Sequence, residues 1–249
     1  MKILLISEHF PSKNNTKFTG GVEAKNFFVS KYLANKNKVN VITTDPGASR
    51  IEKINEVMVH RIGNIGYKAS SGSILDRINF VIKAIKESRK IEADIVEGSN
   101  FITHFIAKII SKQKNIPSVA WYPDVWLKTW LKNGGVVGVF GEILERWNLR
   151  NGFDVYIAIS KSTAGKLKKY TNKKIHVVYC GVDHSEFKLG KSDKEINKTI
   201  LCVTRLVAYK NVKDLILAFA HVSTKQHYAR LLIVGRGPEE ASLKALVRN

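Results

Sequence analysis

The 249-residue sequence contains few cysteines and no long apolar run. Its two cysteines, Cys180 and Cys202, are not spaced as metal ligands, and both lie in or beside apolar segments. This favours buried free thiols in a reducing cytosol over a disulfide framework. The apolar run at the amino terminus is too short for a signal peptide, and no run is long enough to cross a bilayer. We therefore expect a cytoplasmic protein.

Acidic residues are also scarce, with 21 Asp and Glu against 41 Lys and Arg, which gives a net charge of +20. This balance indicates an anionic partner such as nucleic acid, an acidic membrane or a phosphorylated substrate, or else a lysine-rich solvated surface. Nucleic acid is the least favoured partner, because the sequence has no RNA-binding aromatic pattern, zinc finger or recognition helix.

Apolar strand-like runs alternate with helical patterns along the chain. Ser73 is a candidate cap for one helix, on which Ile78, Val81, Ile82 and Ile85 share a face. The alternation predicts an α/β fold with parallel sheets covered on both faces. We expect strands over residues 2–7, 38–43, 57–62, 94–97, 117–121, 154–159, 175–179, 200–204 and 231–234, and helices over 21–33, 74–90, 101–112, 141–148 and 160–170.

A polar stretch over residues 188–198, or the turn at Gly181–Asp183, is the best domain boundary. We therefore expect one Rossmann-like domain over residues 1–182 and a second over 183–249. Two expected strands follow residue 199, fewer than a doubly wound half normally has. Because a two-stranded fragment buries its faces poorly, we expect this second domain to be incomplete and to lean on the first domain or on a missing segment.

Cations and glycines follow several expected strands. Arg205 and Lys210 follow the strand over 200–204, at the sheet edge where ligands bind in this class of fold. An Arg fork and a Lys point charge suit a phosphate, although surface cations are common. Each of two glycine pairs has two interpretations, a close approach of the backbone to a phosphate or a plain turn before a helix. They are Gly20 with Gly21, and Gly235 with Gly237.

Five segments in one order closely resemble the retaining GT-B glycosyltransferases of family 4, the glycogen synthase and mannosyltransferase type. They are GGVE at 20–23, DVYIAISKST at 154–163, CGVDHSEF at 180–187, VTRLVAYK at 203–210 and VGRGP at 234–238. The resemblance covers nearly the whole chain. It implies two Rossmann-like domains and transfer of a sugar from a nucleotide donor, with no metal or other cofactor.

The resemblance also implies roles for individual residues. Arg205 and Lys210 would hold the donor diphosphate, Gly20 and Gly21 would lie beside the donor phosphate, and Gly235 and Gly237 would line the nucleotide pocket. Asp124 stands where the family commonly has a His near the reacting sugar, and a turn role after Pro123 is the alternative. His9 follows the first strand and is a second candidate ligand.

The family usually carries two Glu separated by seven residues, a spacing that this sequence lacks. The predicted reaction is retaining transfer of a hexose from a UDP- or GDP-sugar to a glycan or lipid-linked acceptor. The alternatives are a non-catalytic glycan- or lipid-binding chain that depends on a partner, and a sugar-nucleotide epimerase of the same fold.

All four Trp lie between residues 121 and 147, where Trp126 and Trp130 are interleaved with Lys128 and Lys132. This pattern suits the cytosolic face of an anionic membrane, while packing of the aromatics in the core is the alternative. His104, on an apolar helix, is typical of a core histidine.

Overall fold

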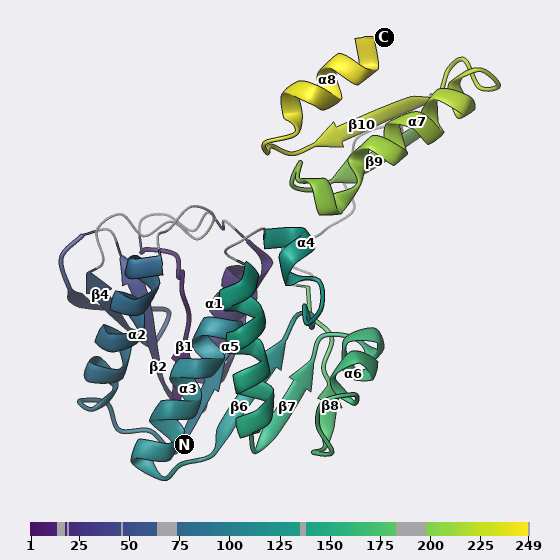
Figure 1. Cartoon of the computed structure of the whole chain (residues 1–249). Helices are drawn as coiled ribbons and strands as arrows, with labels where there is room; N and C mark the ends of the chain where they lie inside the picture. Colours follow the sequence, from purple (N-terminus) through teal and green to yellow (C-terminus); the bar gives the residue numbers. More distant parts are fainter. Residues whose placement is uncertain are drawn as a thin grey trace. The chain divides into compact units, whose positions relative to one another are not determined.

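The computed structural model describes residues 1–13, 18, 20–45, 47–63, 74–134, 138–182 and 198–248. The chain divides into two compact units, Met1–Gly181 and Val182–Asn249 (Figure 1). Ser73, Asp183 and most of the polar stretch over 188–198, which the sequence analysis singled out, lie outside the described residues.

The first unit is built on an eight-stranded sheet with the order β3-β4-β2-β1-β5-β6-β7-β8 among the described residues. Neighbouring strands are parallel except for β3, which pairs antiparallel with β4. The predicted α/β fold is therefore confirmed. The strands are β1 (Lys2–Ile6), β2 (Lys38–Asp45), β3 (Arg50–Ile54), β4 (Val57–Gly63), β5 (Ile95–Gly98), β6 (Ser118–Tyr122), β7 (Val155–Ala158) and β8 (Ile175–Val177).

The edge strand β3 was not predicted from the sequence. It forms a hairpin with β4 through Asn55 and Glu56, whose φ angles of 47° and 64° suit a tight two-residue turn. Its residues, RIEKI, are largely exposed and charged, as is common in an edge strand. Such a segment has little apolar periodicity by which to recognise it.

Helices cover both faces of this sheet (Figure 1). Leu4 and Ile6 of β1 pack into the cluster beneath α2 and α3, while Ile3 and Leu5 pack against α1. Burial on both faces explains the uninterrupted apolar sequence of β1. The helices are α1 (Gly21–Ala34), α2 (Ile74–Ser88), α3 (Phe101–Lys114), α4 (Trp130–Gly134), α5 (Gly138–Asn151) and α6 (Lys161–Leu167), of which α4 was not predicted.

The predicted apolar face of α2 is divided between two environments. Val81 and Ile85 pack against the core next to the fully buried Phe80. Ile78 and Ile82 are 49% and 60% exposed, although they belong to the same apolar stripe. The helix therefore has more apolar surface than its contact with the sheet uses.

The second unit contains a parallel strand pair in its described residues, β9 (Thr199–Val203) and β10 (Arg230–Val234). The 3-10 turn η2 (Ala208–Lys210) and the helices α7 (Val212–Ser223) and α8 (Glu240–Arg248) complete it. The core side is formed by Leu206, Val212, Ile216 and Leu243, with Leu231 and Ile233 packed against them. On the strands, four residues in register are exposed: Leu201, Leu232, Val203 and Val234.

Neither unit contains, within its described residues, a helix that is long and apolar enough to cross a membrane.

Candidate active site

The sheet of the first unit reverses its winding between β1 and β5, which are neighbours in the strand order. In open α/β sheets, ligands bind at the carboxyl ends of the strands that flank such a switch point. Glu8 follows β1 and Asn100 follows β5, and the Asn100 amide donates a hydrogen bond to the Glu8 carboxylate. These residues, which the sequence analysis did not single out, join the two strand ends at the expected ligand position.

Asn100 also begins α3. Its side-chain oxygen accepts hydrogen bonds from Ile102 N at 3.1 Å and Thr103 N at 3.0 Å, which forms a capping box with Thr103. The same side chain therefore fixes the helix start and reaches Glu8. The sequence N-F-I-T after the strand IVEG was the pattern that could have revealed this residue.

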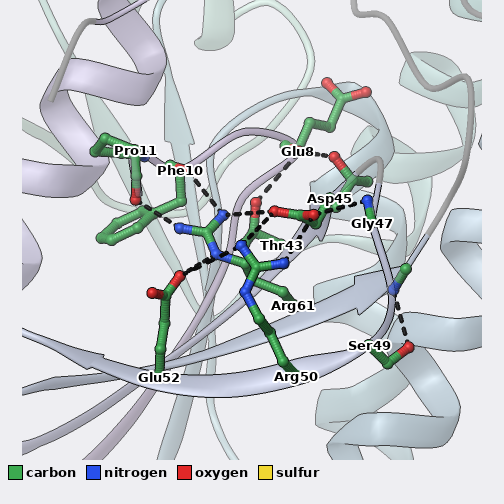
Figure 2. A network of polar contacts seen from close by, with 12 residues as sticks. Glu8, Phe10, Pro11, Thr43, Asp45, Gly47, Ser49, Arg50, Glu52 and Arg61 are labelled. Atoms are coloured by element: carbon green, nitrogen blue, oxygen red, sulfur yellow. Dashed lines mark hydrogen bonds and ion pairs between the residues drawn. The ribbon is translucent and has the colours of Figure 1, made fainter. Parts of the chain in front are cut away.

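The loop that carries His9 is held by a buried arginine (Figure 2). Arg61 of β4 is 3% exposed and donates to Phe10 O at 3.1 Å and Pro11 O at 2.6 Å. It also forms ion pairs with Glu52 and with Asp45 at the sheet edge. The loop is thus fixed by hydrogen bonds to its own carbonyl groups.

His9 itself is half-buried, and its carbonyl oxygen accepts a hydrogen bond from Ser7 Oγ at 2.7 Å. Its position directly after Glu8 places it at the carboxyl edge of β1. A role for its imidazole as a ligand remains a prediction.

Gly20 and Gly21 lie at the start of α1. The Gly20 backbone is extended, with φ −167° and ψ 164°, and a Cβ atom added at either glycine would meet nothing within 4 Å. Packing within the described residues therefore does not require glycine here. The open space is compatible with the predicted approach to a phosphate, but no contact tests it.

The first turns of α1 contact the switch point through buried polar groups. Lys25 forms an ion pair with Glu97 of β5, and its Nζ lies 4.6 Å from the centre of the Trp121 ring. Asn26 donates to Ser7 Oγ at 2.8 Å and accepts from Ser99 Oγ at 2.9 Å. These contacts fix the start of α1 against the ends of β1 and β5.

Asp124 follows β6 at the same edge of the sheet. Its Oδ1 accepts a hydrogen bond from Val125 N at 2.8 Å and forms an ion pair with Lys166 Nζ at 2.7 Å. The side chain is 42% exposed. The geometry thus includes the turn interaction expected of this residue, and it leaves a carboxylate accessible at the sheet edge. Its proposed place near the reacting sugar is untested.

His104, in contrast, is a core residue, as the sequence predicted. Its Nε2 lies 3.0 Å from Trp121 O, and the ring is 1% exposed. Burial lowers the pKa of His104 to about 3, so the imidazole stays neutral at physiological pH.

A cavity of about 1000 Å³ opens from this edge and extends along the helices on one face of the sheet. Polar side chains lie at the strand ends, and apolar side chains from α2, α3 and α5 line the remainder. Glu8, Asn100, Tyr122 and Asp124 are the polar side chains at the strand ends, and Arg77 of α2 forms an ion pair with Glu8 at 3.8 Å.

Three of the four tryptophans line this cavity: Trp126, Trp130 and Trp147. They are half-buried, whereas Trp121 is 4% exposed beside Lys25 and does not line the cavity. Core packing therefore applies to Trp121, whereas the other three tryptophans line a cavity, and the predicted membrane contact of this region is untested.

Glu145 is a buried carboxyl group in the cavity wall. It accepts hydrogen bonds from Trp130 Nε1 at 2.6 Å and from Trp126 N at 3.3 Å. Burial raises the pKa of Glu145 to about 7, despite these two donors. The residue orients two cavity-lining tryptophans and is partly protonated near neutral pH.

In the second unit, Arg205 and Lys210 both lie at the carboxyl end of β9 and contact Tyr209. Arg205 Nη2 donates to Tyr209 Oη at 2.5 Å, and Lys210 Nζ lies 5.5 Å from the centre of the Tyr209 ring. Both cations are exposed, and within the described part of the chain neither forms an ion pair with a carboxylate. Tyr209, which the sequence analysis missed, positions the Arg205 guanidinium.

Gly235 and Gly237 are required by close backbone contact. A Cβ at Gly235 would lie 1.8 Å from Thr204 O, and one at Gly237 would lie 2.1 Å from Leu206 O. Leu206 N also donates to Arg236 O at 2.9 Å. The two glycines therefore let the loops after β9 and β10 pack together, and their predicted contact with a nucleotide is untested.

The family model described as Glycosyltransferase Family 4 matches residues 19–186. The chain belongs to this glycosyltransferase family. A second model, Glycosyl transferases group 1, matches residues 184–249, so the two matches meet close to the boundary between the units. No curated protein matches the sequence.

Solved glycosyltransferases share the fold of this family 4 chain. Sucrose-phosphate synthase from Thermosynechococcus elongatus has 16% identity and a TM-score of 0.76 over 98% of this chain and 66% of its own. HepE from Anabaena in complex with UDP has 17% identity and a TM-score of 0.68 over 100% and 65%. The lipopolysaccharide outer core galactosyltransferase WaaB has 18% identity and a TM-score of 0.60 over 100% and 64%.

The predicted GT-B fold, with two Rossmann-like units, is therefore confirmed. The chain spans about two thirds of the length of each of these three proteins. In the residues that the structure describes, no group of three or more His, Cys, Asp or Glu is placed to hold a metal ion.

Proposed function

We propose that this protein transfers a hexose from a UDP- or GDP-sugar to a glycan or lipid-linked acceptor with retention of configuration, in the cytoplasm. The observation that carries the proposal is the pair of consecutive glycosyltransferase family matches, over residues 19–186 and 184–249. Structures of the similar HepE contain UDP, UDP-glucose, or UDP with glucose, which supports a nucleotide-sugar donor.

Arg205 and Lys210 are proposed to hold the donor diphosphate. They are exposed cations at the carboxyl end of a parallel strand, and Tyr209 orients the guanidinium. As the sugar leaves, negative charge develops on the diphosphate, and fixed cations stabilise it. Gly235 and Gly237 would keep the neighbouring loop close enough to line the nucleotide pocket.

The acceptor is proposed to lie at the carboxyl edge of the first unit. Asp124, Glu8 and Asn100 supply carboxylate and amide groups that suit sugar hydroxyls, and His9 lies on the adjoining loop. Gly20 and Gly21 would offer their backbone N–H groups to the donor phosphate. Positioning of the two substrates would supply much of the rate effect.

Nucleoside diphosphate binding tests the donor site. Arg205→Ala removes a charged donor of hydrogen bonds, so we expect affinity for UDP or GDP to fall roughly 10- to 100-fold by calorimetry. Arg230→Ala is the matched control, because Arg230 is an exposed cation at the opposite, amino end of β10. Equal affinity in wild type and Arg205→Ala would refute the diphosphate role.

A sugar-nucleotide epimerase is the second candidate, because UDP-GlcNAc 2-epimerase from Neisseria meningitidis is also structurally similar, with a TM-score of 0.56 and 13% identity. Incubation of UDP-sugars with and without acceptors distinguishes the two. Release of UDP together with a glycosylated acceptor supports the transferase, whereas conversion of the sugar without any acceptor supports the epimerase. Donor binding with no turnover supports a non-catalytic chain that depends on a partner.

A further inference from the structure

The cavity of the first unit has apolar walls that the sheet does not use. Ile74, Ile78 and Ile82 lie at successive turns of α2 and line the cavity, although all three side chains are exposed. From α5, Phe140 and Ile143 contribute in the same way and are 55% and 61% exposed. Large apolar side chains gathered on one exposed surface usually mark a binding site rather than a structural need.

The polar end of this cavity is the sheet edge already described. Glu8, Asn100 and Asp124 lie there, and Arg77 of α2 pairs with Glu8, whereas mostly apolar side chains from α2, α3 and α5 line the rest. A ligand that fills both parts must be amphiphilic, with hydroxyls at the strand ends and a hydrocarbon chain between the helices. The volume of about 1000 Å³ is ample for such a ligand.

The surface around the cavity is basic. In the described parts of residues 74–90 and 126–151, every exposed charged side chain is Lys or Arg. Lys86 follows Ile82 by four residues, and Arg150 follows Ile143 by seven, so helical spacing places each on the same face as its isoleucine. Exposed apolar groups flanked by cations match an anionic lipid surface. These cations are Lys86, Arg89, Lys90, Lys128, Lys132, Arg146 and Arg150, of which Lys90 and Arg146 form ion pairs with the less exposed Glu87 and Glu142.

We propose that the cavity between α2, α3 and α5 holds the hydrocarbon chain of a lipid-linked acceptor, and that the surrounding basic and apolar surface rests on the anionic bilayer that supplies it. The inference rests on the proposed function, because it names the acceptor class for the same sheet edge. The acceptor hydroxyl would lie beside Glu8, Asn100 and Asp124, while its chain replaces water along Ile78, Ile82 and Ile143.

Alkyl maltosides below their micelle concentrations test the cavity, since they join a sugar to a chain of chosen length. We expect dodecyl maltoside to change the fluorescence of Trp126, Trp130 and Trp147. Across the alkyl maltoside series, affinity for the protein should rise about two- to fourfold for each methylene added to the alkyl chain. Maltose, which has no alkyl chain, should not bind measurably. Absence of chain-length dependence overturns the proposal.

Paired substitutions locate this binding. Ile82→Gln with Ile143→Gln places amides at two exposed cavity positions, and we expect about tenfold weaker binding of dodecyl maltoside. Ile51→Gln is the matched control, because Ile51 is 57% exposed, close to the 60% of Ile82, and lies on β3 away from the cavity. Equal weakening in both variants overturns the assignment to the cavity.

Flotation with vesicles of phosphatidylcholine and phosphatidylglycerol tests whether a bilayer supplies the hydrocarbon chain. We expect binding to rise with the anionic fraction, to fall with salt, and to be reduced at least threefold by Lys86→Gln with Arg150→Gln. Lys36→Gln with Lys38→Gln, at the amino edge of β2, should float like wild type. Maltoside binding without flotation overturns the membrane part and assigns the cavity to a soluble amphiphile.

A second copy of the chain is the competing occupant. A concentration-dependent dimer that is lost in Ile82→Gln with Ile143→Gln, together with no lipid binding, overturns the proposal. Failure of the proposed function is distinguished by UDP binding, which depends on Arg205 in the other unit and needs no lipid.

Discussion

The carboxyl ends of the parallel strands use charge in opposite ways in the two units. In the first unit, Arg61 and Lys25 are buried and paired with carboxylates, and both hold loops or helices in place. In the second unit, Arg205 and Lys210 are exposed, and their described contacts are with Tyr209. The same residue types therefore have a structural role at one edge and are available to a ligand at the other.

Burial and pairing make this distinction, rather than residue type. A buried cation whose hydrogen-bonding capacity is used by carbonyls and carboxylates has little left for a substrate. An exposed cation beside an aromatic ring keeps its charge accessible to a phosphate. At the carboxyl edge of the second unit, backbone contacts at Gly235 and Gly237 join the loops. Arg205 and Lys210 are therefore not needed to hold these loops together.

Arg61→Met should produce the largest effect. It leaves the carbonyls of Phe10 and Pro11 and the carboxylate of Glu52 without their buried donor, so the first unit should lose about 3–5 kcal/mol of unfolding free energy. All four Trp lie in this unit, so urea unfolding followed by Trp fluorescence reports on it. Arg50→Met is the control, since Arg50 also pairs with Asp45 but is 44% exposed, and it should lose less than about 1 kcal/mol. Similar losses in both variants would remove the contrast between buried and exposed cations.

Glu145 should make the first unit less stable as the pH rises. Folding raises the pKa of this carboxyl from an ordinary 4.5 to about 7, so between these values the folded state holds a proton that the unfolded state has released. Stability should therefore fall between pH 4.5 and 7, by up to about 3 kcal/mol. Glu145→Gln should flatten this dependence in urea unfolding followed by Trp fluorescence. An unchanged slope in that variant would contradict the buried carboxyl.

Gly235→Ala should weaken the packing between the loops that follow β9 and β10 in the second unit. The added methyl lies 1.8 Å from Thr204 O, so the loops must separate, at about 1–3 kcal/mol. Hydrogen exchange should show reduced protection of the amides in β9 and β10. Gly21→Ala is the control, because a Cβ there meets nothing within 4 Å. Unaltered exchange would show that backbone contact does not hold this edge.

Tyr209→Phe should have the smallest effect, because the interaction that it removes is exposed. Without the hydroxyl, Arg205 loses its described hydrogen bond and samples more orientations. We expect nucleoside diphosphate affinity to fall about two- to fivefold by calorimetry, with the hydrogen exchange of β9 and β10 unchanged. A loss as large as that of Arg205→Ala would show that Tyr209 contacts the ligand itself.

The strands and most helices could be predicted because apolar periodicity survives in the sequence. The run KILLI and the alternation of strands with helices indicated a sheet covered on both faces, and that is how β1 is buried. The periodicity failed for β3, whose residues are largely exposed and charged and precede a hairpin turn, and for the short α4. Tertiary pairing, not local sequence, determines such segments.

Parts of the candidate site were harder to predict from the sequence. Arg205 and Lys210 became candidates because cations that follow an apolar strand form a local pattern, and the family resemblance implied their diphosphate role. Glu8 and Asn100 are 92 residues apart and meet because β1 and β5 are neighbours in the sheet. No local pattern encodes that adjacency, and the same holds for the cavity between α2 and α5.

By itself, the sequence determined the family, the α/β class and the positions of the strand-end cations, since these depend on ordered motifs and short-range periodicity. The tertiary structure decided which charges are paired within the fold and which stay accessible, and it showed that most of an apolar stripe on α2 lines a cavity. Both depend on strand order and helix packing, which bring together residues that are distant in sequence and which set how much of each side chain is removed from water.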